Sequence, residues 1–444
     1  MPAPLSERTT ASDILALALP ALGSLAADPL VSLVDTMFVG RIDGTALGAL
    51  GVCSAVFGLA FFVFNFLSTG VTPLVASAVG RGDRDEAGRW IMQALTLAVI
   101  LGLLATAALE GLTEPILSGM GARGALWAPS ETYLRIRALA TPAVLLITVG
   151  HGAFRGHQNT RTPFWLTLGL NVVNLVLDPL LIFGLGWGIA GAAWATTIAQ
   201  WVGAVGFLAA VFAPSGLGVR FAIPKLRDLA PLLKVGSALS LRTFALVSTF
   251  TLATAVATRI GERAVAAHQV VAQIWLFLAL VVDSVAIAGQ ALVGRLLGQG
   301  ERTEARRVAD RLLRWGLVLG LVLGAVFWAL GPILPGWFTD EAAILRDVDT
   351  VYIFVIVSQP IGALVFVWDG LFMGAQDFRF LAAQMLLSAA AGAAVLLSVI
   401  PMGWGLTGVW WGMIALLSAR LLTLGWRYWL GGGPLAKGRA PGGD

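Results

Sequence analysis

The chain has 444 residues, of which 58% are apolar and only 12% are charged. Soluble domains carry about 25% charged residues, so this composition argues against a soluble enzyme and, despite the net charge of +4, against a nucleic-acid-binding protein. The single cysteine, Cys53, excludes an internal disulfide and a cysteine-rich metal site. We therefore expect a membrane protein whose partners are the lipid bilayer and small molecules.

Apolar runs long enough to cross a bilayer recur along the whole chain. Runs that end at charges or at Gly/Pro clusters number about twelve, which predicts an all-α polytopic membrane protein with twelve transmembrane helices. We place these helices at residues 13–41, 50–79, 87–111, 130–155, 162–184, 188–213, 228–259, 264–297, 306–330, 343–373, 379–401 and 405–430.

The distribution of Lys and Arg predicts the orientation of these helices. With both termini inside, the inner segments carry about three times as many Lys and Arg residues as the outer segments. In this assignment Arg135 and Arg137 are outer, Arg420 is inner, and Arg242 lies within a helix. We expect a multi-pass protein of the inner (cytoplasmic) membrane with both termini in the cytoplasm.

The second half of the chain repeats the first. A shift of 218 residues brings Gly80-Arg-Gly82 onto Gly298-Gln-Gly300 and aligns later motifs in the same way. We therefore divide the chain into two six-helix lobes, residues 1–217 and 218–444. Because six is even, both lobes enter the membrane from the same side and are parallel repeats, an arrangement that commonly holds a midplane site and works by alternating access.

Asp35 lies in the outer part of the first apolar run. An acid at the centre of a membrane helix costs roughly 2.5–3.5 kcal/mol on insertion scales, so it indicates function. The repeat acts as an internal control, because the residue equivalent to Asp35 in the second lobe is Ala253. The fold therefore does not require this acid.

Polar residues also follow one face of the helix predicted at 162–184. Asn171, Asn174 and Asp178 are spaced as neighbours on one helix face, and Pro179 frees a backbone carbonyl one turn earlier. Carboxylate, amide and carbonyl oxygens suit a hard cation or a proton relay. An interhelical hydrogen-bond clamp is the alternative interpretation.

We assign the residues that bind the coupling proton, or alternatively Na⁺, as Asp35, Asp178, Asn174 and Thr196. The candidate relay residues are Asp28, Asn171 and Gln200. Asp28 lies on the same helix face as Asp35 and precedes Pro29, so it either belongs to the relay or satisfies a proline kink.

Methionine and aromatic side chains suit adaptable binding of varied substrates, although ordinary packing is the favoured role for any one of them. The candidates for an apolar substrate pocket are Met37, Phe38, Phe61, Phe64 and Phe154. Arg242 could form a structural salt bridge with Asp283 or with Asp369, the interpretation that we favour, whereas the alternative for Asp369 is contact with a cationic substrate. The chain contains no Walker-type loop, zinc spacing or nucleophile elbow, so we expect no ATP, cofactor or resident metal other than a coupling Na⁺.

In this order and spacing, the motifs resemble those of the multidrug and toxic compound extrusion (MATE) family, and more narrowly its DinF-type subgroup. The motifs are Asp35-Thr-Met-Phe-Val-Gly40-Arg-Ile, the paired Gly80-x-Gly82 and Gly298-x-Gly300 loops, Gly152-Ala-Phe-Arg-Gly156 and Asn174-x-x-x-Asp178. The resemblance covers nearly the whole chain. It implies a V-shaped, two-lobed antiporter that exports amphipathic, often cationic, organic compounds in exchange for H⁺ or Na⁺.

The chain departs from one pattern of that family. Members with a C-lobe cation site use an acid on the seventh helix and another early in the tenth, whereas here the seventh helix has no acid between Asp228 and Glu262 and Asp369 comes late in the tenth. We therefore favour the N-lobe residues and H⁺. A flippase for lipid-linked precursors and an exporter of a specific organic anion or metabolite remain the alternatives, and we expect a monomer.

Overall fold

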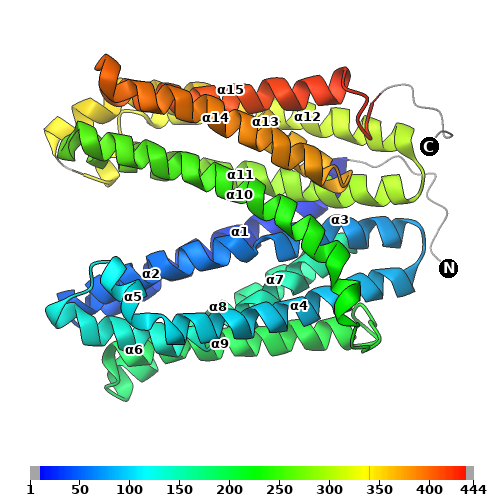
Figure 1. Cartoon of the computed structure of the whole chain (residues 1–444), viewed down its shortest axis with the longest axis horizontal. Coiled ribbons are helices and arrows are strands. Elements are labelled where there is room, and N and C mark those ends of the chain that lie inside the picture. Colours follow the sequence, from blue (N-terminus) through cyan, green and yellow to red (C-terminus); the bar gives the residue numbers. More distant parts are fainter. Residues whose placement is uncertain (1–10, 340, 437–444) are drawn as a thin grey trace. The chain divides into compact units, whose positions relative to one another are not determined.

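The computed structural model describes residues 11–339 and 341–436, and the regular structure of these residues is entirely helical. It contains two compact units (Figure 1). The first unit is Leu19–Gly236, and the second combines the residues before Leu19 with the chain from Ser237 onwards. These limits fall inside two long helices, whereas the lobe boundary at residue 217 comes from sequence repetition and stays a prediction.

The first unit is formed by helices joined through short connections, including three-residue turns and a 3-10 turn at Gly124–Leu126 that leads directly into α6. Its helices are α1 (Ala11–Gly40), α2 (Gly44–Phe64), α3 (Phe66–Gly80), α4 (Arg84–Gly111), α5 (Thr113–Gly119), α6 (Trp127–Ala138), α7 (Thr141–Gly156), α8 (Arg161–Pro179) and α9 (Gly188–Phe212). The initial residues of α1, up to Ala18, belong to the second unit.

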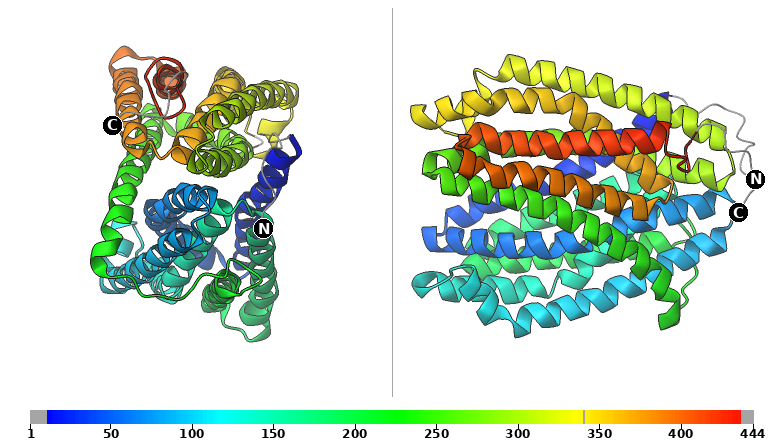
Figure 2. Two further views of the ribbon diagram at one scale, coloured as in Figure 1. Left: turned by 90° about the vertical axis from the view of Figure 1, so that its right-hand side faces the viewer. Right: turned by 45° about the horizontal axis from the view of Figure 1, so that its top comes forward.

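The second unit contains longer helices, which run alongside one another in Figure 2. They are α10 (Ala230–Ile260), α11 (Glu262–Gly298), α12 (Arg302–Leu330), α13 (Ala342–Gly374), α14 (Phe378–Met402) and α15 (Gly405–Trp429). A short 3-10 turn at Leu334–Trp337 precedes α13, and another at Leu226–Leu229, still within the first unit, precedes α10. The beginning of α10, up to Gly236, belongs to the first unit.

Among the described residues, 11 helical segments are long and apolar enough to cross a membrane. A further pair, Gly124–Ala138 and Thr141–Gly156, meets the same requirement together and is bent by 48°. If this pair is one span, the total is 12, the number that the sequence predicts. The bend lies where Pro142 occupies the first turn of α7, a position that favours the start of a new helix.

The backbone repeats where the sequence repeats. Gly82 and Gly300 both adopt left-handed φ angles, of 77° and 80°. Gln158 and Gln376 do the same at 57° and 58°, although a side chain makes this conformation unfavourable. Two Gly-Trp-Gly turns also share left-handed glycines, at Gly186, Gly188, Gly403 and Gly405. Equivalent turns in the two halves therefore have the same backbone geometry.

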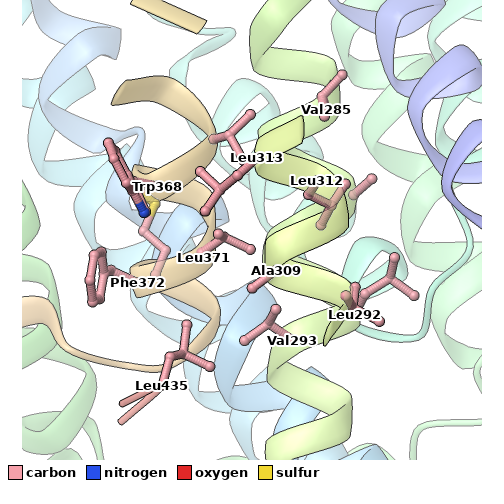
Figure 3. Packing of buried hydrophobic residues seen from close by; sticks show 14 of the residues in the cluster. Val285, Leu292, Val293, Ala309, Leu312, Leu313, Trp368, Leu371, Phe372 and Leu435 are labelled. Atoms are coloured by element: carbon pink, nitrogen blue, oxygen red, sulfur yellow. The ribbon is translucent and has the colours of Figure 1, made fainter. Parts of the chain in front are cut away.

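One buried hydrophobic cluster of the second unit lies largely between α11, α12 and α13 (Figure 3). Leu292 of α11, Leu312 of α12 and Phe372 of α13 are buried there, together with Leu435 from beyond α15. The approach of α11 to α13 depends on the lack of a side chain at Gly370, since a Cβ atom there would lie 2.3 Å from the carbonyl oxygen of Ala286. Small residues permit this kind of close packing between membrane helices.

Candidate functional site

Two of the candidate residues lie at the end of α8. Asn174 and Asp178 are one turn apart, and their exposed fractions are 2% and 0%. Pro179 ends the regular helix, and a π turn at Leu180–Gly184 follows, closed by a 2.9 Å hydrogen bond from the Leu185 amide to the Leu180 carbonyl. Single π turns often occur at functional sites because they reorient nearby side chains.

A hydrogen-bonded chain joins α8 to α9. The Asn174 amide donates to Asp178 Oδ2 at 3.3 Å and to Thr196 Oγ1 at 3.4 Å. Thr196 in turn donates to the backbone carbonyl of Ala192 at 3.0 Å. Asn174 therefore presents hydrogens, rather than its carbonyl oxygen, to both of these neighbours.

The side chain of Asp35 interacts with that of Asp178, so the acid of α1 and the acid of α8 meet inside the first unit. Asp35 is half-buried, and its Oδ1 atom has no hydrogen-bond partner among the described residues. The same is true of Asp178 Oδ1. The structure thus brings together all four residues that we assigned to ion binding. Their role as a coupling site stays a prediction.

Arg137 is a neighbour of this site that the sequence analysis missed. We assigned it to an outer segment, but only 8% of it is exposed, and its guanidinium carbon lies 5.4 Å from the ring centre of Phe57. Arg137 interacts electrostatically with Asp35, Tyr133 and Cys53. The repeat contains a signal that could have identified it, because the equivalent residue in the second half is the apolar Val355.

The candidate relay residues are less clearly connected to the four residues assigned to ion binding. Asn171 is buried and Gln200 is partly buried, and neither Asn171 Nδ2 nor Gln200 Oε1 has a hydrogen-bond partner within the described part of the chain. Thr167, one turn before Asn171, lies 3.1 Å from His151 Nε2. The side chain of Asp28 is outside the described residues, so its part in a relay stays a prediction.

The candidate substrate-binding residues of the first unit differ in exposure. Met37 is 62% exposed, whereas Phe154 is 1% exposed and packs edge-on against Phe207. Phe61 stacks on Phe57, with ring centres 5.6 Å apart. Ordinary packing therefore accounts for Phe154 and, in part, for Phe61.

Two further candidates are partly buried. The ring of Phe38 meets that of Phe183 edge-on at 6.4 Å. Phe64 ends α2 just before Asn65 interrupts the helix. Neither arrangement tests a role in substrate binding, which stays a prediction for both residues.

In the second unit, Asp369 is held between two arginines. Arg242 Nη2 lies 2.6 Å from Asp369 Oδ2, and Arg420 donates to the same oxygen. Arg420, which we counted with the cytoplasmic residues, is only 1% exposed. The Arg242–Asp369 pair is present, as the salt-bridge interpretation of the sequence suggested, and the alternative contact between Asp369 and a cationic substrate stays a prediction.

The surroundings of the first-unit acids bear on the choice between Na⁺ and H⁺. Two carboxylates and a threonine hydroxyl are suitable oxygen donors, but Asn174 directs its NH₂ group toward the cluster and Arg137 already supplies a positive charge beside Asp35. Hard cations require several oxygen ligands arranged around them. The same residues can hold a proton between two carboxyl groups without such a shell.

Known proteins resemble this chain over most of its length. The family model described as MatE matches residues 20–180 and 238–399. Protein DETOXIFICATION 44, chloroplastic, from Arabidopsis thaliana is 35% identical over 439 residues, which cover 95% of this chain and 83% of that protein. DNA damage-inducible protein F from Escherichia coli (strain K12) is 28% identical over 434 residues, or 94% of this chain and 92% of that protein.

Solved structures share the fold. A crystal structure of MATE in the bent conformation has a TM-score of 0.86 at 21% identity and covers 93% of this chain and 94% of that one. The outward-facing conformation of a multidrug resistance MATE family transporter of the MOP superfamily also has a TM-score of 0.86 at 21% identity, over 95% and 98% of the two chains. These likenesses confirm the predicted fold class, an all-helical multi-pass membrane protein.

Proposed function

We propose, because the chain belongs to the MatE family of multidrug and toxic compound extrusion transporters, that it exports amphipathic organic compounds, including cations, in exchange for protons. Family membership confirms the resemblance found in the sequence and identifies the chain as a transporter rather than an enzyme. Proton coupling and the class of exported compound are our proposals.

The contact between Asp35 and Asp178 is the observation that supports proton coupling. When both carboxyl groups are ionised, two negative charges lie together in a region shielded from water, which is electrostatically unfavourable. A single proton removes one charge and lets one carboxyl group donate a hydrogen bond to the other. Proton binding can therefore stabilise the arrangement in which the two acids face each other.

Antiport follows if the substrate and the proton favour different conformations. A ligand shifts a conformational equilibrium only by the difference between its affinities for the two states. We propose that the protonated acid pair stabilises the state that has released substrate, and that loss of the proton to the cytoplasm restores the state that binds it. Asp35 lies on α1 and Asp178 on α8, so a change in their contact alters how these two helices pack.

We further propose that the protein acts as a monomer in the inner (cytoplasmic) membrane, with both termini in the cytoplasm and without a cofactor. The excess of Lys and Arg in the segments assigned to the inside supports this orientation. Small organic compounds are the proposed substrates.

Gradient-driven efflux from proteoliposomes tests the proposal. Liposomes loaded with a cationic dye are exposed to an inward proton gradient or an inward Na⁺ gradient, and dye loss is followed by fluorescence. We expect the proton gradient to drive efflux. We expect Asp35→Asn to reduce the efflux rate to that of dye-loaded liposomes without protein. If Asp35→Asn exports dye with the wild-type dependence on pH, the proposed mechanism is wrong.

Asp43→Asn is the matched control, since it makes the same chemical change a short distance along the chain. Asp43 caps α2 by accepting a 2.7 Å hydrogen bond from the Ala46 amide. Asparagine caps helices about as well as aspartate, so this variant should retain normal efflux.

An exporter of organic anions is the second candidate. The observation that favours it is the second-unit cluster in which one carboxylate, Asp369, is held by two guanidinium groups, Arg242 and Arg420. Efflux of a carboxylate dye and of a cationic dye from the same vesicles separates the two candidates. Measurement of fluorescent lipid transfer between the leaflets of those vesicles would reveal the remaining alternative, a lipid flippase.

A further inference from the structure

The first unit contains a buried cation, Arg137, that the fold itself does not require. The residues equivalent to Asp35 and Arg137 in the second half are Ala253 and Val355, and both are fully buried. The same fold is therefore built in the second half without either charge. Because the acid and the cation both belong to the first half alone, we infer that Arg137 serves the function of the acids.

The surroundings of Arg137 hold it beside the acids. Arg137 is in the last turn of α6, where its guanidinium group lies over Phe57 of α2. The carbonyl oxygens around it are tied to other helices, because Thr197 donates to Ile136 at 3.2 Å and Thr106 donates to Ala138 at 2.8 Å. These hydrogen bonds fix the backbone at this end of α6, and the Arg137 side chain would lose its contact with Phe57 if it turned away.

The neighbouring charged groups Arg135, Glu110 and Glu131 pair with one another rather than with the acids of the site. Arg135, on the exposed side of α6, pairs with Glu110 at 3.0 Å and with Glu131 at 2.9 Å. Arg137 instead acts on Asp35, Tyr133 and Cys53, and its Nη1 atom has no hydrogen-bond partner among the described residues. A buried guanidinium with an unpartnered nitrogen is expensive unless nearby negative charge compensates it.

We propose that Arg137 is the resident counter-ion of the Asp35–Asp178 pair and that it restricts the coupling ion to a proton by excluding Na⁺. This inference rests on the proposed ion-coupled transport. An arginine side chain stays charged in proteins, so Arg137 permanently balances one of the two carboxylates. One proton between the carboxyl groups then completes the neutralisation, and a metal cation would meet both the charge of Arg137 and the NH₂ group of Asn174.

The test compares Na⁺ binding by wild type and Arg137→Met. Methionine retains an unbranched apolar chain that can pack on Phe57 but removes the charge. We expect no saturable ²²Na⁺ binding by purified wild type and saturable binding by Arg137→Met, measured in detergent by scintillation proximity. Arg137→Lys, which preserves the charge, should resemble wild type. Arg135→Met is the matched control on the same helix, and it should also bind no Na⁺.

Absence of Na⁺ binding by folded Arg137→Met, or saturable binding by wild type, would overturn the inference. Size-exclusion chromatography identifies folded protein, and Arg137→Gln replaces the methionine variant if that one aggregates. The Na⁺-binding experiment and the proton-driven efflux experiment can fail independently of each other. If wild type shows no proton-driven efflux while Arg137→Met gains Na⁺ binding, proton antiport is wrong but the role of Arg137 stands. If proton-driven efflux is present and Na⁺ binding is not gained, only the role of Arg137 is wrong.

Discussion

Removal of the charge of Asp369 should destabilise the second unit strongly. In Asp369→Asn, the partly buried guanidinium group of Arg242 and the buried one of Arg420 lose the carboxylate that they share. At the 2.6 Å contact between Arg242 and Asp369, and with an effective dielectric constant of about 20, the gross attraction is about 6 kcal/mol. Desolvation offsets part of it, and loss of one partner from a buried ion pair typically costs about 3–5 kcal/mol.

The free energy of unfolding can be measured by titrating the purified protein from mild detergent into sodium dodecyl sulfate and following tryptophan fluorescence. Asp347→Asn is the matched control, because Asp347 pairs with Arg263 at 3.4 Å, and the Arg263 side chain is exposed and that of Asp347 partly exposed. Exposed ion pairs contribute about 0–1 kcal/mol, so this variant should unfold almost as wild type does. If Asp369→Asn loses no more stability than Asp347→Asn, the buried pair does not have the energy that we assign to it.

A triple variant tests whether the unfolding cost comes from leaving buried charges unpaired rather than from losing the charged cluster itself. Arg242→Met, Asp369→Leu and Arg420→Met together replace the charged cluster with apolar side chains of similar length. Buried ion clusters replaced in this way often retain or gain stability, because the desolvation of the charges no longer opposes folding. The triple variant should therefore be clearly more stable than Asp369→Asn alone.

Two other predictions concern packing in the second unit. Gly370→Ala should lower the free energy of unfolding by about 1–3 kcal/mol in the same titration, since its Cβ atom would lie 2.3 Å from the carbonyl oxygen of Ala286; Gly362→Ala, which meets no atom within 4 Å, should not. Arg306→Met should make the C-terminal segment more sensitive to protease, because Arg306 holds the Leu435 carbonyl at 2.6 Å.

The control for the protease experiment is Arg307→Met. Arg307 is exposed and pairs only locally, with Glu304 at 2.9 Å. Equal cleavage of the two variants would mean that Arg306 does not restrain the C-terminal segment.

The helices could be predicted from the sequence because the ends of the apolar runs coincide with helix breakers along most of the chain. The run predicted at 188–213 begins after a Gly-Trp-Gly turn and ends before Pro214, and the structure has Gly188–Phe212. The run predicted at 130–155 hides a break between Ala138 and Thr141, because Leu139 and Ala140 continue the apolar pattern across it. Hydrophobicity alone cannot distinguish a straight span from a bent one.

The candidate site was predictable only where its members are local in sequence. Asn174 and Asp178 are one turn apart on α8, and the short connection from α8 to α9 brings Thr196 beside them. Arg137 and Arg420 were missed because position along an apolar run does not show whether a charged side chain faces the interior of the protein. Only the contacts between helices show that each of these arginines faces an acid.

The division of α1 between the two units has a consequence for biosynthesis. Ile14 and Leu17, near the start of the chain, are buried with Val285 of α11 and Phe372 of α13. At about 5–20 residues per second, the ribosome needs roughly 20–70 s to make the residues that separate Leu17 from Phe372. During that time the beginning of α1 lacks its native neighbours, so the core of the second unit can close only after nearly all of the chain has been made.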